Sequence, residues 1–200
     1  MKKSLTVGCV IMASGLSRRF GANKLLADFC GQPMLCRAFA ATATPGISAR
    51  IVVTRSEEVQ ALCRAHGVPV LLHSLPGRND TVWLGLSALL EQLPELSGCM
   101  FLPGDQPLLR RESVGMLVDF YREHPEHIAA LGHDGVRGNP CLFPARLFPE
   151  LLALQGDHGG NQVIRRHEED LLLWEVPAPE LTDVDTPQVL AQLRRDMAEE

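Results

Sequence analysis

Short apolar runs alternate with helix-like stretches along most of this chain, and this alternation constrains the fold more than any other feature. Each run is apolar at consecutive positions, a pattern typical of strands that are covered on both faces of a sheet. Because the runs are separated by helical segments, the strands should be mostly parallel to one another. We place strands at residues 5–12, 50–54, 68–72, 99–102, 128–131, 141–143 and 171–176.

Helix-like segments lie between these strands. Pro33 is expected at the first position of one helix, where its missing N–H costs nothing. Ser56 is expected to cap the next helix, which should end near Gly67. Further helices are expected at residues 80–93, at residues 112–124 and after Thr186 and Pro187. The order predicts a three-layer α/β fold, with helices on both faces of a mostly parallel central sheet. At 200 residues, we expect one domain spanning 1–200.

Composition excludes several classes of protein. The chain has 19 basic and 24 acidic residues, a net charge of −5, which argues against electrostatic binding to nucleic acid or to an anionic membrane. No apolar run reaches the about 18 residues needed to cross a bilayer. The run that follows Met1-Lys2-Lys3 is short and leads directly to arginines, so we interpret it as a strand, not a signal peptide. Six cysteines without a CxxC pair indicate free, mostly buried thiols and a cytoplasmic location.

Other aromatic and titratable residues are expected to be structural. Trp83 and Trp174 should lie in the core. His73 belongs to a group of five histidines without the spacing of metal ligands, and these are expected at the surface.

A glycine loop rich in cations follows the first strand. Gly15 and Gly21 let the backbone turn sharply and approach a ligand. Arg18, Arg19 and Lys24 lie in the same loop of an otherwise acidic chain. Backbone N–H groups and convergent cations are suited to holding a polyphosphate, although the cations could also be merely solvated. The spacing matches neither the Walker loop nor the dinucleotide-binding fingerprint.

Acidic residues occur at two further places. Asp105 follows the strand at 99–102, where a carboxylate could bind Mg²⁺ or could instead form an Asx-turn or helix cap. Asp183 and Asp185 alternate on an extended segment, so both side chains could point to one ion, or one could belong to the cap region of the last helix. A polar cluster at 79–81 could cap a helix or read a pyrimidine edge through Thr81.

The motifs at 15–21, at 104–107 and at 183–187, together with Lys24 and Leu25, resemble those of the nucleotidyltransferases with a Rossmann-like fold. The molybdenum cofactor cytidylyltransferase group is the most similar. The resemblance implies that Arg19 and Lys24 neutralise the triphosphate of an NTP and act in catalysis with Asp105. It also implies metal ligation by Asp105 and Asp185, with Asp183 as the alternative to Asp185. The implied nucleotide-binding residues are Ala13, Ser14, Gly15, Arg19, Lys24, Thr81 and Asp105. Ser14 stands where alanine or glycine is common.

The same resemblance implies an activity. A nucleotidyl group would pass from an NTP, with CTP favoured, to molybdenum-molybdopterin, with Mg²⁺ as cofactor and pyrophosphate as product. The dinucleotide cofactor would then serve a molybdenum hydroxylase apo-enzyme. Segments 138–143 and 155–161 resemble acceptor-facing parts of that group, and His158 and Asp157 receive no catalytic role.

Two alternatives stay open. Segment 75–82 looks more like the cytidylyltransferase of the methylerythritol phosphate pathway, so a sugar or polyol phosphate is an alternative acceptor. A non-catalytic protein that delivers finished cofactor to the hydroxylase is the alternative of another class.

Overall fold

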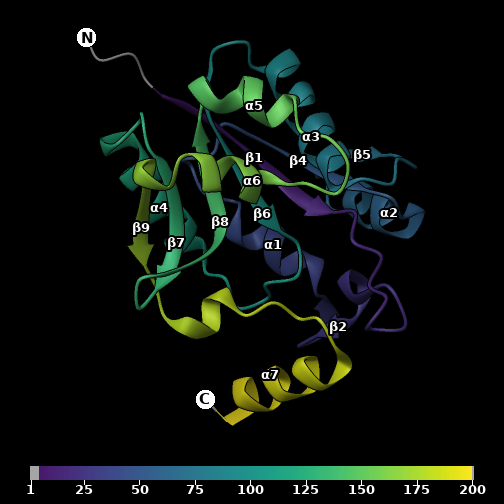
Figure 1. The fold of residues 1–200 in the computed structure, drawn as a ribbon. Helices are drawn as coiled ribbons and strands as arrows, with labels where there is room; N and C mark the ends of the chain where they lie inside the picture. Colours follow the sequence, from purple (N-terminus) through teal and green to yellow (C-terminus); the bar gives the residue numbers. More distant parts are fainter. Residues whose placement is uncertain (1–4, 200) are drawn as a thin grey trace.

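A seven-stranded sheet forms the centre of the computed structural model, which describes residues 5–199 (Figure 1). The strand order is β5-β4-β1-β6-β8-β7-β9. β8 pairs antiparallel with both β6 and β7, whereas the other pairings in this sheet are parallel. The strands are β1 (Thr6–Ala13), β4 (Ala49–Thr54), β5 (Val70–Leu72), β6 (Leu96–Pro103), β7 (Ile128–His133), β8 (Val136–Pro144) and β9 (Leu171–Glu175). The predicted α/β class and all seven predicted strands are therefore confirmed.

Helices cover both faces of the sheet and make the three layers (Figure 1). One core cluster joins α1 (Leu35–Ala41), α2 (Glu57–Ala65), α4 (Arg111–Glu123) and α7 (Pro187–Glu199) to the sheet. The other core cluster joins α3 (Arg78–Gln92), α5 (Phe148–Leu152) and α6 (Gly160–Arg166) to the opposite face. Adjacent residues of β1 alternate between the two, with Cys9 and Ile11 in the first cluster and Val10 in the second. Burial on both faces explains why the strands read as continuous apolar runs.

The topology creates a switch point between β1 and β6, the kind of place where open α/β sheets commonly bind ligands. The chain runs from β1 outward to β4 and β5, and then returns to place β6 on the other side of β1. At such a switch point, the loops at the carboxyl ends of the two neighbouring strands diverge and leave a crevice. The loops concerned are the glycine loop after β1 and the Asp105 turn after β6. The fold therefore brings together two of the three motifs.

One helix start differs from the expectation. Pro33 does not begin a helix; it lies in β3 (Gln32–Pro33) and pairs with Asp28 of β2 (Asp28–Phe29). Cys30 and Gly31 both have positive φ, 53° and 88°, and form the tight turn of this hairpin. The hairpin uses the residues before Leu35, so α1 begins two residues later than predicted. The Ser56 cap is confirmed, because its Oγ accepts the Val59 N–H at 3.2 Å.

Several smaller expectations also have an outcome. Cys30 is exposed and the five other cysteines are buried, all of them free, as predicted. Trp83 is 45% exposed on α3, so its placement in the core was wrong. His73 is half-buried and bonded to Ser14, so it is not simply a surface histidine. Among residues 5–199, the helices lack the length and hydropathy needed to cross a bilayer. The predictions for Met1-Lys2-Lys3 and residue 200 lie outside the described residues.

Candidate active site

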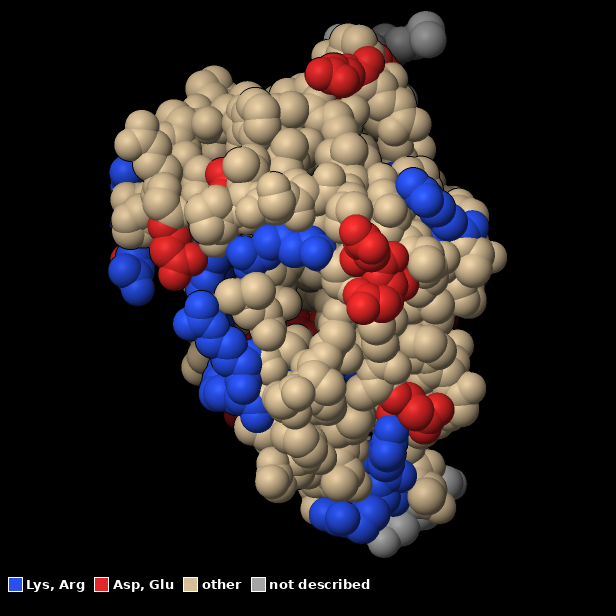
Figure 2. All heavy atoms as spheres, turned by 90° about the vertical axis from the view of Figure 1, so that its right-hand side faces the viewer, with Lys and Arg blue, Asp and Glu red and all other residues tan. Residues whose placement is uncertain are grey.

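A cavity of about 800 Å³ opens at the carboxyl ends of β1 and β6. Its polar wall is formed by the glycine loop, and an apolar part is formed by Val82, Phe101 and Phe143. In the space-filling view, a hollow lies beside a band of lysine and arginine side chains (Figure 2). The cavity is lined by residues 12–19, 24–25, 55, 76–78, 81–82, 101, 103, 105, 139, 141, 143, 157, 159–161, 164, 183 and 185.

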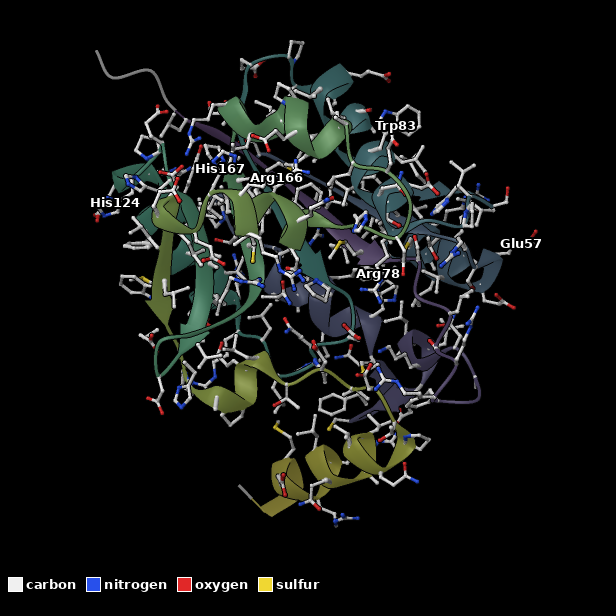
Figure 3. All side chains as sticks on the ribbon, in the orientation of Figure 1. Glu57, Arg78, Trp83, His124, Arg166 and His167 are labelled. Atoms are coloured by element: carbon white, nitrogen blue, oxygen red, sulfur yellow. The ribbon has the colours of Figure 1, made fainter. Side chains whose placement is uncertain are left out.

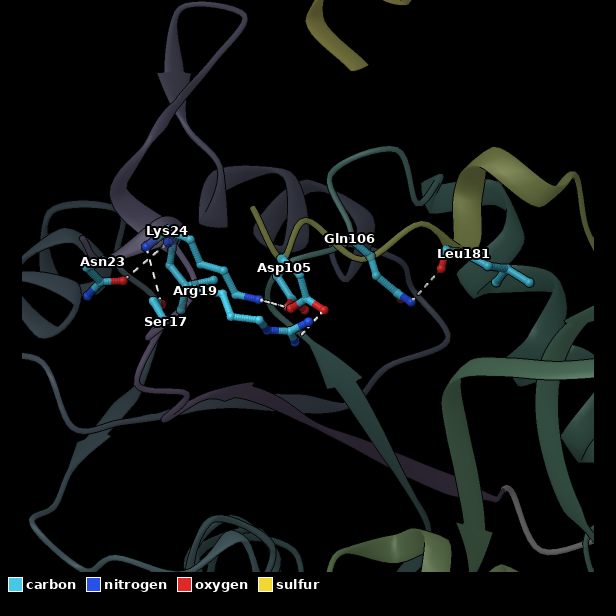
Figure 4. A network of polar contacts seen from close by, with 9 residues as sticks. Ser17, Arg19, Asn23, Lys24, Asp105, Gln106 and Leu181 are labelled. Atoms are coloured by element: carbon cyan, nitrogen blue, oxygen red, sulfur yellow. Dashed lines mark hydrogen bonds and ion pairs between the residues drawn. The ribbon is translucent and has the colours of Figure 1, made fainter. Parts of the chain in front are cut away.

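Two cations and two carboxylates meet at one side of this cavity (Figure 4). The Nζ of Lys24 lies 2.5 Å from Oδ2 of Asp105 and 3.0 Å from Oδ1 of Asp185. The Nη2 of Arg19 lies 2.7 Å from the other carboxylate oxygen of Asp185. The structure therefore brings together the four charged residues that the sequence assigned to phosphate and metal binding. Their functional roles stay predictions.

The charges adjust to each other within this group. Burial opposes the charge of Lys24, but the carboxylates of Asp105 and Asp185 outweigh it and raise the lysine pKa. The hydrogen bond from Lys24, together with the charges of Lys24 and Arg19, lowers the pKa of Asp185. The Lys24 and Asp105 side chains are only 12% and 18% exposed, so solvent screens this pair less than a surface ion pair.

Local structure in the glycine loop sets the position of Lys24. The Asn23 side chain accepts the Leu25 N–H at 3.2 Å and caps a short 3₁₀ turn at Lys24–Leu26. The Lys24 N–H donates to Oγ of Ser17 at 3.4 Å, which closes the loop on itself. Gly21 has φ of 78°, a conformation that glycine adopts without steric cost. These contacts direct the lysine side chain across the loop toward the end of β6 (Figure 4).

Close packing between β1 and β6 sets the position of Asp105. The Gly104 N–H donates to the Met12 carbonyl at 3.1 Å, so the turn after β6 lies against the end of β1. A Cβ on Gly104 would lie 2.9 Å from Cδ1 of Leu35 and 3.3 Å from the Met12 carbonyl oxygen, so glycine permits this close packing without a shift of its neighbours. The next residue, Gln106, is buried and donates to the Leu181 carbonyl at 3.3 Å (Figure 4). The turn is thereby fixed to the segment that carries the other two aspartates.

The segment before α7 runs beside Asp105 as extended chain. The Val184 N–H donates to the Asp105 carbonyl at 2.9 Å, and the Val184 side chain is fully buried. Because side chains alternate along extended chain, Asp183 and Asp185 both point to the cavity side, and both line it. Thr186 caps α7 by accepting the Val189 N–H at 3.3 Å, so neither aspartate is needed for that purpose.

Asp183 is the third carboxylate of the group. Partial burial, followed by the nearby Asp105 and Asp185 carboxylates, raises its pKa to about 6, although the residue as a whole is exposed. We therefore expect part of the folding stability to fall as pH rises from about 4 to about 6, because the folded state holds this proton more tightly than the unfolded state does. Asp183→Asn should lack this pH-dependent contribution to the free energy of unfolding.

Melting temperatures of the wild type and Asp183→Asn, measured from pH 4 to pH 8, check this expectation. The melting temperature of the variant, relative to that of the wild type, should rise up to about pH 6 and should then stay level. A difference that is the same at every pH would contradict the assignment. The exposure of Asp183 means that the gain should be small.

The predicted nucleotide-binding residues also line the cavity. Ala13, Ser14 and Gly15 form its wall at the end of β1, and Thr81 lies on α3, facing the same cavity, almost fully buried. Asp80 stabilises the start of α3 by accepting the Gly77 N–H at 2.7 Å. The capping interpretation of segment 75–82 therefore holds for Asp80, while the binding role of Thr81 stays a prediction.

Two arginines of the cavity were missed by sequence reasoning. Arg55 follows β4 directly, so the rule that ligands bind at the carboxyl ends of strands could have identified it. Arg78 is the first residue of α3 and pairs with Asp157, another residue that lines the cavity, at 3.4 Å; it lies near the middle of Figure 3. Arg78 lies in segment 75–82, which the sequence singles out, but sequence reasoning assigned no role to Arg78 there. Segments 138–143 and 155–161, predicted to face an acceptor, do line the cavity, through Asn139 and Asn161 among others.

A family model decides the assignment. The model of the MobA-like NTP transferase domain matches residues 9–171. The chain belongs to this family. The matched part contains the glycine loop and Asp105, whereas Asp183 and Asp185 lie beyond it. Family membership rests on the match over residues 9–171, and the role of the motif at 183–187 is inferred from the resemblance and from the geometry above.

Two curated relatives of this chain are a cytidylyltransferase and a purine catabolism protein. The 3-deoxy-manno-octulosonate cytidylyltransferase of Neisseria gonorrhoeae is 32% identical over 113 residues, 56% of this chain and 44% of that protein. This chain thus spans less than half the length of that relative. The purine catabolism protein PucB of Bacillus subtilis is 25% identical over 211 residues, 99% of this chain and 100% of that protein.

Solved structures share the fold. Rv0371c of Mycobacterium tuberculosis superimposes with a TM-score of 0.82 at 22% identity, over 96% of this chain and 99% of that one. A CMP:2-keto-3-deoxy-manno-octonic acid synthetase complexed with CTP gives a TM-score of 0.75 at 19% identity, over 97% and 99% of the two chains. A further Rv0371c structure is a complex with manganese, at 20% identity and a TM-score of 0.73, over 95% and 98%. At these identities the likeness extends to the fold alone.

Proposed function

We propose that the chain is a nucleotidyltransferase that takes a nucleotidyl group from an NTP and releases pyrophosphate. The observation that carries the proposal is the ion-paired group at one side of the cavity, where Lys24 lies between Asp105 and Asp185. Cations for a triphosphate and carboxylates for a metal are present within one space large enough for a nucleotide. A protein that only carries a finished cofactor has no need of paired carboxylates.

CTP is the proposed donor and molybdenum-molybdopterin the proposed acceptor. Similarity to a cytidylyltransferase supports the choice of cytidine nucleotide. The acceptor, and a molybdenum hydroxylase apo-enzyme as recipient of the product, rest on the resemblance of the motifs. We also propose that residues 1–200 form one nucleotidyltransferase domain, which the full-length similarity to PucB supports. A sugar or polyol phosphate remains the second candidate acceptor, because segment 75–82 resembles the cytidylyltransferase of the methylerythritol phosphate pathway. The cytidylyltransferase relative also takes a sugar derivative, 3-deoxy-manno-octulosonate, as its name says.

The carboxylates fit a hard divalent cation. Asp105 and Asp185 offer oxygen ligands to one position. The Lys24 ammonium already pairs with both carboxylates, so this position favours positive charge. These two residues would hold Mg²⁺, which when bound neutralises charge on the reacting phosphates and orients them. The manganese complex of a structural neighbour supports the choice of a divalent metal.

The protein's own residues bind and orient the triphosphate. Lys24 and Arg19 stabilise negative charge as it develops on the departing pyrophosphate, and N–H groups of the Gly15 loop hold the phosphate oxygens. The acceptor phosphate is already ionised at neutral pH, so its attack requires positioning more than proton removal. This is why neither His158 nor Asp157 needs a catalytic role.

A nucleotide and acceptor screen tests the proposal. Purified protein is incubated with Mg²⁺, each of the four NTPs and either molybdenum-molybdopterin or methylerythritol phosphate, and pyrophosphate is measured. We expect release with CTP and the molybdenum cofactor. Release with the sugar phosphate alone would favour the second acceptor. No release with any pair, combined with thermal stabilisation by the dinucleotide product without Mg²⁺, would favour the carrier and overturn the proposed enzyme.

A further inference from the structure

The Arg55 side chain joins two loops at the edge of the cavity. It follows β4, between the loop after β1 and the loop after β5. Its Nε donates to the Ser14 carbonyl at 2.8 Å, and its Nη2 donates to the same oxygen. Its Nη1 donates to the carbonyls of Leu75 and Pro76 at 3.4 and 3.3 Å. All three guanidinium nitrogens are therefore bonded to backbone carbonyls of neighbouring loops.

Ser14 is held from a second direction. Its Oγ donates to the Val53 carbonyl at 3.0 Å, so the 2.9 Å contact with Nε2 of His73 must be a hydrogen bond donated by the histidine. The backbone N–H of His73 donates to the Thr54 carbonyl at 3.0 Å, which fixes the histidine to β4. Burial, followed by the nearby charge of Arg55, lowers the His73 pKa and keeps the ring neutral.

These contacts determine what Ser14 can offer to a ligand. Its carbonyl is bonded to Arg55, and its hydroxyl is used in bonds to Val53 and His73. Ser14 stands where alanine or glycine is common, and its additional hydroxyl therefore makes contacts within the protein.

The two loops that Arg55 connects both line the cavity. Ser14 and Gly15 line the cavity on one side, and Pro76 and Gly77 line it just before α3, which carries Thr81. A planar guanidinium can donate in both directions at once, whereas a lysine ammonium is a single point of charge. The separation between the loops thus depends on an arginine at position 55.

We propose that Arg55 is a positioning residue that sets the width of the nucleotide-binding part of the cavity, and that His73 orients Ser14 within it. The inference rests on the proposed function, because it concerns the same cavity. Arg55 acts through the two loops and does not itself hold the phosphates.

Nucleotide binding by Arg55→Lys tests the proposal. Isothermal titration with CTP and Mg²⁺ should show Kd about tenfold higher than for the wild type, and the KM for CTP should rise in parallel. At saturating CTP, kcat should stay within about threefold of the wild type, since uniform binding is what is lost. Arg64→Lys is the matched control, because Arg64 is an exposed arginine of the neighbouring helix α2; it should leave Kd unchanged.

Two further experiments separate positioning from folding. In Arg55→Ala, millimolar guanidinium should restore tight CTP binding, and methylammonium should not, because only the planar ion can reach both loops. His73→Gln keeps a donor near the position of Nε2 and should bind CTP like the wild type, whereas His73→Leu should bind it several-fold more weakly.

Each contrary result has a defined meaning. A lower melting temperature for Arg55→Lys with unchanged Kd would show a merely structural role and overturn the inference. A fall in kcat with unchanged KM would place Arg55 in the chemical step and would also overturn it. A wild-type protein that binds none of the four NTPs would overturn the proposed function, and the inference with it.

Discussion

Asp105→Asn is expected to release pyrophosphate about a hundredfold to a thousandfold more slowly than the wild type, because the metal would lose a charged ligand next to the reacting phosphates. Asparagine keeps the size of the side chain, and the backbone carbonyl of Asp105 still accepts the Val184 N–H. The fold should therefore persist. Single-turnover measurement at saturating CTP, Mg²⁺ and acceptor isolates the chemical step from binding.

Asp134→Asn is the control for this variant. Asp134 lies in the turn between β7 and β8 with a side chain that is 90% exposed and a φ of 49°, which asparagine tolerates. It should have wild-type activity. If Asp105→Asn also released pyrophosphate at the wild-type rate, while folded by circular dichroism, Asp105 could not be the metal ligand and the proposed mechanism would fail.

Lys24→Met should change nucleotide binding and metal binding in opposite directions. Lys24 lies between Asp105 and Asp185, so it occupies the position where a divalent cation would be attracted. Without its ammonium, Mn²⁺ alone should bind roughly tenfold more tightly, equivalent to about 1.4 kcal/mol. CTP should bind more weakly, by about 1.5–3 kcal/mol, because a charge-assisted hydrogen bond to the triphosphate is lost.

Electron paramagnetic resonance of free Mn²⁺ and isothermal titration with CTP provide the two measurements. Without metal, the variant should melt at a lower temperature than the wild type, since three neighbouring carboxylates lose their buried counter-charge, and Mn²⁺ should raise its melting temperature by more than it raises that of the wild type. Arg64→Met, on the exposed side of α2, controls for loss of a surface charge. Unchanged or weaker Mn²⁺ binding in Lys24→Met would contradict the shared position of ammonium and metal.

The motifs were predictable from sequence because each lies next to an element that the sequence also reveals. Lys24 and Asp105 follow apolar strands, and the carboxyl ends of parallel strands share one edge of a sheet. Asp185 precedes a helix with a clear Thr-Pro start, and extended chain makes it parallel to Asp183. The meeting of these residues, however, depends on backbone bonds such as Val184 to Asp105, which no local pattern encodes.

What could not be predicted depends on contacts between loops. Arg55 is an ordinary arginine in the sequence, and its role appears only when the loops after β1 and β5 are placed beside it. Proline is common at the first position of a helix, but Pro33 lies in a hairpin, because Cys30 and Gly31 form a tight turn that pairs β3 with β2. Trp83 lies on a helix that is buried on one face only, and its size gave no indication of which face it occupies.

The route of the chain after β9 affects the order in which a folding chain completes its candidate site. Every strand of the central sheet is complete by Glu175, yet Asp183 and Asp185 reach the cavity only when the following segment docks along the Asp105 turn. A newly made chain could thus assemble its framework before it possesses a full set of acidic ligands. The proposed activity would be acquired last, when the segment after β9 packs against the sheet and helices that have already formed.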